Sequence, residues 1–379
     1  MTTIDSTAAT TRAPARRRTR TPIVDADIHP VVTPDRLAAA LPEPWRRRFL
    51  RFGLRGAPPP AVYPRVRHGG MRRDSHPAAG PPGSAVRPPG SDLDLMRSQL
   101  LDPYDVVAGV LIPMQGHTAG AEEPAFAAAL CRAYNDVLVT DWLDPEPRLR
   151  ASICIPHESP AEAVAEIERR AADPRFVQVL FPSGTFLPWS DAKYRPIYAA
   201  AAAHGLPVAI HLGGTEGHRG DGWPSFYLEQ HAWYGNAVAV ALTGLVAGGV
   251  LEAVPDLQVV LVEGGVSWLP SLLWGLDDAW ELCRDDVPWL TRPPSEIVRE
   301  RLWFTTQPID EPPVPAHLAT TWEQTGMTDR ILFSSDYPHW DFDDPITALR
   351  VLPAALRRPM AAANAARLYG LTLPGGDDD

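Results

Sequence analysis

Short apolar runs recur along most of the chain, and segments of helical length separate them. The runs are rich in Val, Ile, Leu and Phe without polar alternation, which is typical of parallel strands that are covered on both faces. They lie at 23–29, 106–112, 149–155, 177–181, 207–212, 257–262, 302–305 and 331–334. The helical stretches between them are expected at 122–142, 159–172, 193–204, 237–253, 267–283 and 315–326.

Eight strands, each followed by a helix or a loop, predict an α/β fold of the (β/α)8 TIM-barrel type, formed by residues 23–372 as a single domain. An open, doubly wound sheet is the alternative arrangement. That fold would place a glycine-rich phosphate loop after the first strand, and the sequence at 27–30, Asp-Ile-His-Pro, is not such a loop. The barrel is therefore the favoured architecture.

Three segments stand apart from this alternation. Residues 1–22 are rich in Thr, Ala and Arg and lack the apolar stretch of a secretory signal, so they are expected to form a disordered arginine-rich tail. Residues 41–92, after the first strand, are an insertion rich in Pro, Gly and Arg, and long loops of this kind often act as lids. Residues 373–379 form an acidic tail.

Composition removes several classes of function. The net charge of −11 argues against a nucleic-acid partner, and no apolar run approaches the roughly 20 residues that span a membrane. The 3 cysteines are far apart, which indicates reduced thiols and a cytoplasmic location. The only lysine is Lys193, at the start of an expected surface helix, so Schiff-base chemistry is disfavoured.

Candidate chemistry lies where barrel enzymes carry it, at the C-terminal ends of strands. Asp27 and His29 end the first strand, His211 ends the fifth, Glu263 the sixth and Asp336 the eighth. Because strand side chains alternate, Asp27 and His29 point to the same side, about 6.6 Å apart along the strand. One such histidine or aspartate alone would suggest a core residue or a helix cap. Together they predict a metal site, for which Zn, Fe, Mn, Co and Ni are all suitable.

The same motifs resemble the amidohydrolase-related family, in the branch that includes aminocarboxymuconate-semialdehyde decarboxylase and the resorcylate-type decarboxylases. The resemblance covers roughly residues 22–372 and is weakest over the insertion. It is carried by the segments 27–29, 209–211, 263–265, 268–270, 334–339 and 364–370.

The resemblance implies one divalent metal ion, with zinc expected first, held by Asp27, His29, His211 and Asp336. Strand 4 lacks the lysine that bridges two metals in binuclear relatives, so one metal is the consistent count. The family's decarboxylases usually place a histidine after strand 6, where this chain has Glu263. The carboxylate-x-His pair of strand 1 is closer to the resorcylate group.

These features together predict the non-oxidative decarboxylation of a small cyclic or unsaturated carboxylate. A metal-dependent hydrolase of an ester, lactone or amide is the main alternative, and a metal-free binding barrel is a remote one. The candidate catalytic residues are Asp336, Glu263, His231 and His339, the two histidines lying on loops over the expected barrel mouth. A homo-oligomer is compatible with this interpretation.

Overall fold

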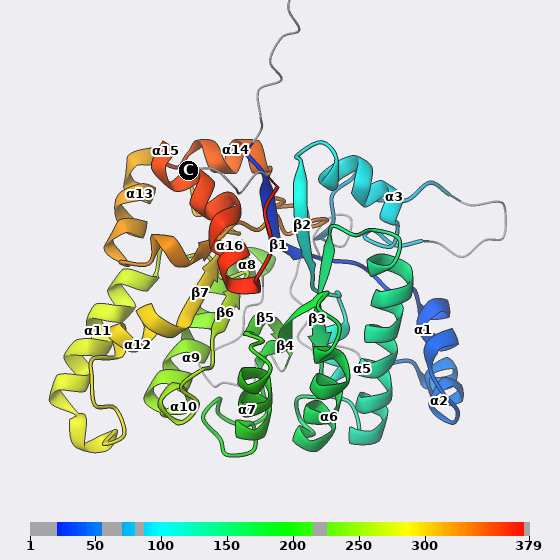
Figure 1. The fold of residues 1–379 in the computed structure, drawn as a ribbon, viewed down its shortest axis with the longest axis horizontal. Coiled ribbons are helices and arrows are strands. Elements are labelled where there is room, and N and C mark those ends of the chain that lie inside the picture. The colour runs from blue at the N-terminus through cyan, green and yellow to red at the C-terminus, as the bar shows by residue number, and fades with distance from the viewer. Residues whose placement is uncertain (1–20, 55–69, 80–86, 215–225, 375–379) are drawn as a thin grey trace, which may run out of the picture.

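Eight parallel strands form the core of the computed structural model, which describes residues 21–54, 70–79, 87–214 and 226–374 (Figure 1). Neighbours in the sheet follow the order of the chain, β1 to β8. The strands are β1 Ile23–Ile28, β2 Val106–Leu111, β3 Leu149–Cys154, β4 Phe176–Gly184, β5 Val208–Gly214, β6 Val259–Val262, β7 Leu302–Thr305 and β8 Ile331–Leu332.

The sheet closes on itself where the segment after β8 meets β1. The Ala26 amide donates a hydrogen bond to the Phe333 carbonyl at 2.9 Å, and the Asp336 amide donates to the Asp27 carbonyl at 3.1 Å. Ile28 also forms a parallel bridge with Tyr337. Closure of an eight-stranded parallel sheet in sequence order confirms the predicted TIM-type (β/α)8 barrel.

Helices surround the strands, and many of them begin with proline at the first or second position, where the missing N–H is not needed. Each of the six predicted stretches is occupied by a helix, principally α5, α6, α7, α9, α11 and α13, of which α9 begins before its predicted bound of 237. The helices are α1 Pro34–Ala40, α2 Trp45–Phe52, α3 Leu93–Met96, α4 Gly116–Ala119, α5 Pro124–Leu138, α6 Pro160–Ala171, α7 Arg195–Ala203, α8 Tyr227–Ala232, α9 Tyr234–Ala247, α10 Val250–Ala253, α11 Leu269–Leu282, α12 Pro294–Arg301, α13 Pro315–Gln324, α14 Pro345–Arg350, α15 Ala354–Arg358 and α16 Asn364–Tyr369.

Alternation along the strands separates two faces of the sheet. On β5, Val208 and Ile210 belong to the apolar cluster that includes Val238 and Leu242 of α9, so these side chains face the helices. Ala209, between them, belongs to the other cluster, together with residues from β4, β6 and β8. His211 has the same phase as Ala209 and therefore points into the barrel.

The described part of the insertion is connected to the loop that follows β8. Met71 forms an antiparallel bridge with His339, and the Arg72 amide donates to the Pro338 carbonyl at 3.0 Å. The insertion therefore reaches the C-terminal mouth of the barrel, while its role as a lid stays a prediction. The expected tails at 1–22 and 373–379 lie almost entirely outside the described residues.

The sequence predicts no membrane-spanning segment. Within the described ranges, no helix has both the length and the apolar character that crossing a membrane requires. The cysteines are free, with Cys131 and Cys154 buried and Cys283 exposed.

Candidate metal centre

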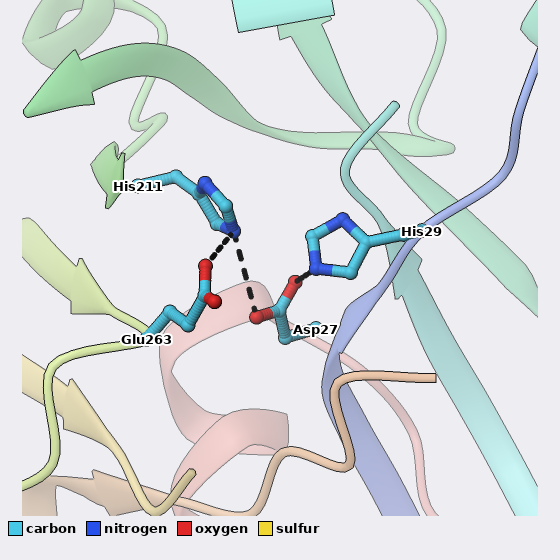
Figure 2. Close-up of side chains that lie close together, drawn as sticks. All are labelled: Asp27, His29, His211 and Glu263. Carbon is cyan, nitrogen blue, oxygen red and sulfur yellow. Dashed lines mark ion pairs between the residues drawn. The ribbon is translucent and has the colours of Figure 1, made fainter. Parts of the chain in front are cut away.

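Four buried side chains converge at the mouth of the barrel, as Figure 2 shows. Asp27 and His29 come from β1 and the residue after it, His211 comes from β5, and Glu263 follows β6. One ligand atom from each of these residues lies within 4.8 Å of the others. Asp336 is the fifth strand-end residue of the prediction, and its carboxylate contacts the cluster at the ring of His29.

Backbone carbonyls fix the orientation of both imidazole rings. Nδ1 of His29 is 2.9 Å from the Ile112 carbonyl oxygen, and Nδ1 of His211 is 2.7 Å from the Leu212 carbonyl oxygen. A carbonyl only accepts, so each Nδ1 carries a proton, and Nε2 of each ring faces the centre of the cluster. Metal-binding histidines are typically held in this way by a partner on the other ring nitrogen.

Carboxylate oxygens face these two nitrogens. His29 Nε2 is 3.1 Å from Asp27 Oδ1 and 2.9 Å from Asp336 Oδ1, and His211 Nε2 is 2.8 Å from Glu263 Oε2. Burial alone would lower the pKa of His29, but the negative charges of Asp27 and Asp336 raise it well above its ordinary value. Burial and the charge of Asp336 raise the pKa of Glu263, although His211 opposes them.

The cluster fits a divalent cation. Both carboxylate oxygens of Asp27 and Nε2 of His29 are buried, and within the described ranges none of these atoms makes a well-aligned hydrogen bond, although the ion-pair distances between them are short. Glu263 and Asp336 bring two more buried carboxyl groups to the same place. Buried charges of one sign are costly unless a counter-charge compensates them, and this mixed imidazole and carboxylate set suits Mn, Fe, Co, Ni or Zn.

Glu263 reaches the cluster through an unusual backbone conformation. Leu261 faces the helices and Val262 faces the interior, so simple alternation would send Glu263 outward. Its φ of 58° turns the chain and directs the side chain to His211 instead. A hydrogen bond of 3.1 Å from the Glu263 amide to Thr305 Oγ1 holds this turn.

Asp336 has the same left-handed conformation, with φ of 60°. Such a conformation costs about 1–3 kcal/mol and is concentrated at functional sites. Oδ1 of Asp336 contacts Nδ1 of His339, and Oδ2 accepts a hydrogen bond from Gln307 Nε2 at 3.0 Å. Burial would raise the pKa of Asp336, but His339 and His29 bring it below its ordinary value.

The two loop histidines of the prediction occupy different places. His339 lies beside the cluster, with its ring centroid 4.8 Å from that of His29. His231, on α8, bonds instead to Asp341 through Nε2 at 2.7 Å. The hydrogen bond to Asp341 raises the pKa of His231. The structure thus brings His339 directly to the candidate metal centre and connects His231 to Asp336 through Asp341 and Gln307.

Two buried or half-buried residues near the cluster were missed by sequence reasoning. Gln307 comes soon after β7, so a search of every strand end for amide side chains as well as ionisable ones would have found it. Asp341 lies in the loop beyond His339, and no pattern in the sequence singles it out. The only lysine, Lys193, pairs with Glu158.

The chain has recognisable relatives over most of its length. Gamma-resorcylate decarboxylase of Rhizobium radiobacter is 24% identical over 304 residues, which cover 74% of this chain and 88% of that protein. Among solved structures, dihydroxybenzoic acid decarboxylase of Polaromonas sp. JS666, with bound manganese and the inhibitor 2-nitroresorcinol, has a TM-score of 0.66 and 19% identity. The similarity covers 93% of this chain and 97% of that one.

A second structure has the same fold. It is the 5-carboxyvanillate decarboxylase of Novosphingobium aromaticivorans in complex with manganese and 4-hydroxy-3-methoxy-5-nitrobenzoic acid, with a TM-score of 0.69 and 16% identity. This similarity covers 92% of our chain and 96% of the other. At the level of families, the amidohydrolase profile matches residues 24–371. The chain therefore belongs to the amidohydrolase family.

Proposed function

We propose that this protein is a metal-dependent decarboxylase of aromatic carboxylates, a carboxy-lyase of the amidohydrolase superfamily. The observation that carries the proposal is the buried convergence of Asp27, His29 and His211 at the barrel mouth. Relatives that are named as decarboxylases of hydroxylated benzoates support the substrate class. The carboxylate-x-His pair on β1 supports it as well.

Four residues are proposed to hold one divalent ion: Asp27, His29, His211 and Asp336. Such an ion supplies positive charge that binds and polarises an anionic oxygen of the substrate. Manganese is present in two of the related structures, whereas zinc is the ion expected from the sequence. Metal analysis of the purified protein decides between them and also tests the remote alternative of a metal-free barrel.

The reaction breaks the bond between a ring carbon and its carboxylate carbon. Carbon dioxide leaves, the ring carbon keeps the electron pair, and a proton must arrive at that carbon. Glu263 is the residue proposed to handle this proton, because it is buried and aimed into the cluster without being needed as a ligand. Positioned acid–base groups contribute about 10²–10⁴-fold to a rate.

The two loop histidines are given supporting roles. His339 keeps Asp336 in place through Nδ1 and retains a second nitrogen, while its side chain is 17% exposed and so borders the mouth. His231 is the candidate for attracting the substrate anion, because the hydrogen bond to Asp341 favours its protonated form. Asp336 remains both a ligand and a candidate catalytic group.

Hydrolysis of an ester, lactone or amide is the second candidate. Glu263 favours it, because the strand-6 position carries a carboxylate where related decarboxylases usually have histidine. A carboxylate beside a divalent ion can act as the base that activates water. The ligand set is the same for both reactions, so the products distinguish them.

The test is an assay of the metal-reconstituted protein against hydroxylated benzoates and, in parallel, against cyclic esters, lactones and amides. Release of carbon dioxide from one or more hydroxybenzoates, dependent on added metal, is the expected result. Metal-dependent hydrolysis without any release of carbon dioxide would replace the decarboxylase assignment with the hydrolase one.

A further inference from the structure

Gln307 forms a bridge between two carboxylates at the mouth of the barrel. It is fully buried, and its Nε2 donates hydrogen bonds of 3.0 Å to Asp336 Oδ2 and of 3.0 Å to Asp341 Oδ2. Its own backbone amide donates to Ser334 Oγ at 3.0 Å, which fixes the chain on which the side chain is carried. Both ends of the residue are therefore held.

The chemistry of the amide allows only one orientation here. Ionised carboxylates accept hydrogen bonds and cannot donate them, whereas an amide nitrogen has exactly two hydrogens to give. With the amide reversed, its oxygen would face two carboxylate oxygens and repel both. Gln307 therefore donates one amide hydrogen to Asp336 and the other to Asp341, and it reduces the repulsion between these neighbouring negative charges.

The bridge continues from Asp341 to the surface of the mouth. Asp341 Oδ2 also faces His231 Nε2 at 2.7 Å, and the ring of His231 lies 5.1 Å from that of Tyr234 and 5.5 Å from that of Trp340. A chain of three hydrogen bonds thus connects His231, beside exposed Trp340, to buried Asp336.

This bridge determines which oxygen of Asp336 is available. Oδ2 is occupied by Gln307, whereas Oδ1 faces the cluster, where it lies 2.9 Å from His29 Nε2 and also contacts His339 Nδ1. We propose that Gln307 and Asp341 are positioning residues for Asp336, which make it offer one oxygen to the cluster and connect its orientation to His231. The proposal rests on the proposed function, because it takes Asp336 as a metal ligand.

The test measures metal binding as well as activity. Partners that orient metal ligands are typically worth about 10–100-fold in metal affinity or activity. We expect Gln307→Leu and Asp341→Ala to raise the dissociation constant for Mn²⁺ by about 10–100-fold, measured by chelator competition. The electron paramagnetic resonance spectrum of bound Mn²⁺ should change as well, because Asp336 gains freedom to rotate. At saturating Mn²⁺, kcat should fall more than KM changes.

Two further variants separate positioning from general stability. Asp341→Asn keeps an oxygen that can accept from Gln307, so its Mn²⁺ affinity should return to within about threefold of the parent protein. Gln178→Leu is the matched control, because Gln178 is equally buried but bonds to Ser152 and Tyr369 at the other end of the barrel. It should leave Mn²⁺ affinity and the spectrum unchanged.

The variant Asp336→Ala, measured in the same series, distinguishes the role of Asp336 as a ligand from the positioning role of Gln307 and Asp341. If Asp336→Ala binds Mn²⁺ like the parent protein, the ligand assignment fails and this inference fails with it. If Asp336→Ala loses Mn²⁺ while Gln307→Leu and Asp341→Ala keep the parent affinity and spectrum, only the positioning role is overturned. The positioning role would also be overturned if Asp341→Asn bound Mn²⁺ as weakly as Asp341→Ala.

Discussion

Replacing Glu263 by glutamine tests the acid–base role proposed for this residue, whose side chain reaches the cluster through a left-handed backbone turn. The change removes one negative charge and keeps the size of the side chain, so the left-handed turn at this position is preserved. The four proposed ligands, Asp27, His29, His211 and Asp336, are untouched. We therefore predict that Glu263→Gln retains the metal ion and loses turnover.

The magnitude follows from the size of the cluster. A carboxylate oxygen of Glu263 lies within 4.8 Å of one ligand atom from each of Asp27, His29 and His211. At that separation and an effective dielectric constant of about 20, the Glu263 carboxylate would attract a unit of positive charge held among these ligand atoms by roughly 3.5 kcal/mol. That energy corresponds to about 2.5 decades in rate. The expected loss in kcat is thus about 10²–10⁴-fold, as for other positioned acid–base groups.

The assay is steady-state turnover at saturating metal, with the metal content of each protein measured in parallel. Asp105→Asn is the matched control, because Asp105 also has a left-handed conformation, with φ of 54°, and lies exposed before β2. It should leave kcat unchanged. Near-normal turnover of metal-loaded Glu263→Gln would refute the catalytic role. Loss of the metal would instead place Glu263 among the ligands and displace one of the four named residues.

Three further changes have defined outcomes. His211→Ala should lose metal and activity together while circular dichroism shows an intact barrel, and full metal occupancy would exclude His211 as a ligand. Ser335→Ala removes a hydroxyl donor from buried Asp25 and should reduce the free energy of unfolding by about 1–3 kcal/mol in a denaturant titration; an unchanged midpoint would contradict this. Burial raises the pKa of Asp343 to about 7, so its stabilising contribution is complete below about pH 4 and is lost as the pH rises through 7. The free energy of unfolding of Asp343→Asn, measured relative to the parent protein, should therefore be higher at pH 8 than at pH 4. The same difference between the two proteins at both pH values would refute this.

Hydrophobic pattern was sufficient to predict the barrel. All eight strands were located, and the strand at 302–305 has the predicted bounds. The last strand is shorter than predicted, Ile331–Leu332 rather than 331–334. The chain leaves the ladder there and bonds to β1 and to Met360, whose carbonyl accepts from the Phe333 amide at 2.9 Å. Such a change of partner depends on tertiary contacts that no local pattern records.

The site was predictable where side chains follow the regular geometry of strands. Asp27, His29 and His211 converge as strand alternation requires. Glu263 was assigned to the mouth correctly, yet alternation alone would direct it outward, and only the positive φ explains its position. Gln307 and Asp341 were missed because their importance comes from hydrogen bonds to residues distant in sequence.

The central claim is that one buried metal ion in this barrel supports decarboxylation of an aromatic acid. The most direct measurement follows carbon dioxide and the matching phenol formed from each of a panel of hydroxybenzoates by chelator-treated protein before and after Mn²⁺ is added back. The account predicts about one ion bound per chain and equal amounts of the two products, formed only after Mn²⁺ returns. A fully loaded protein that releases no carbon dioxide from any hydroxybenzoate, but hydrolyses a lactone or ester, would contradict the account.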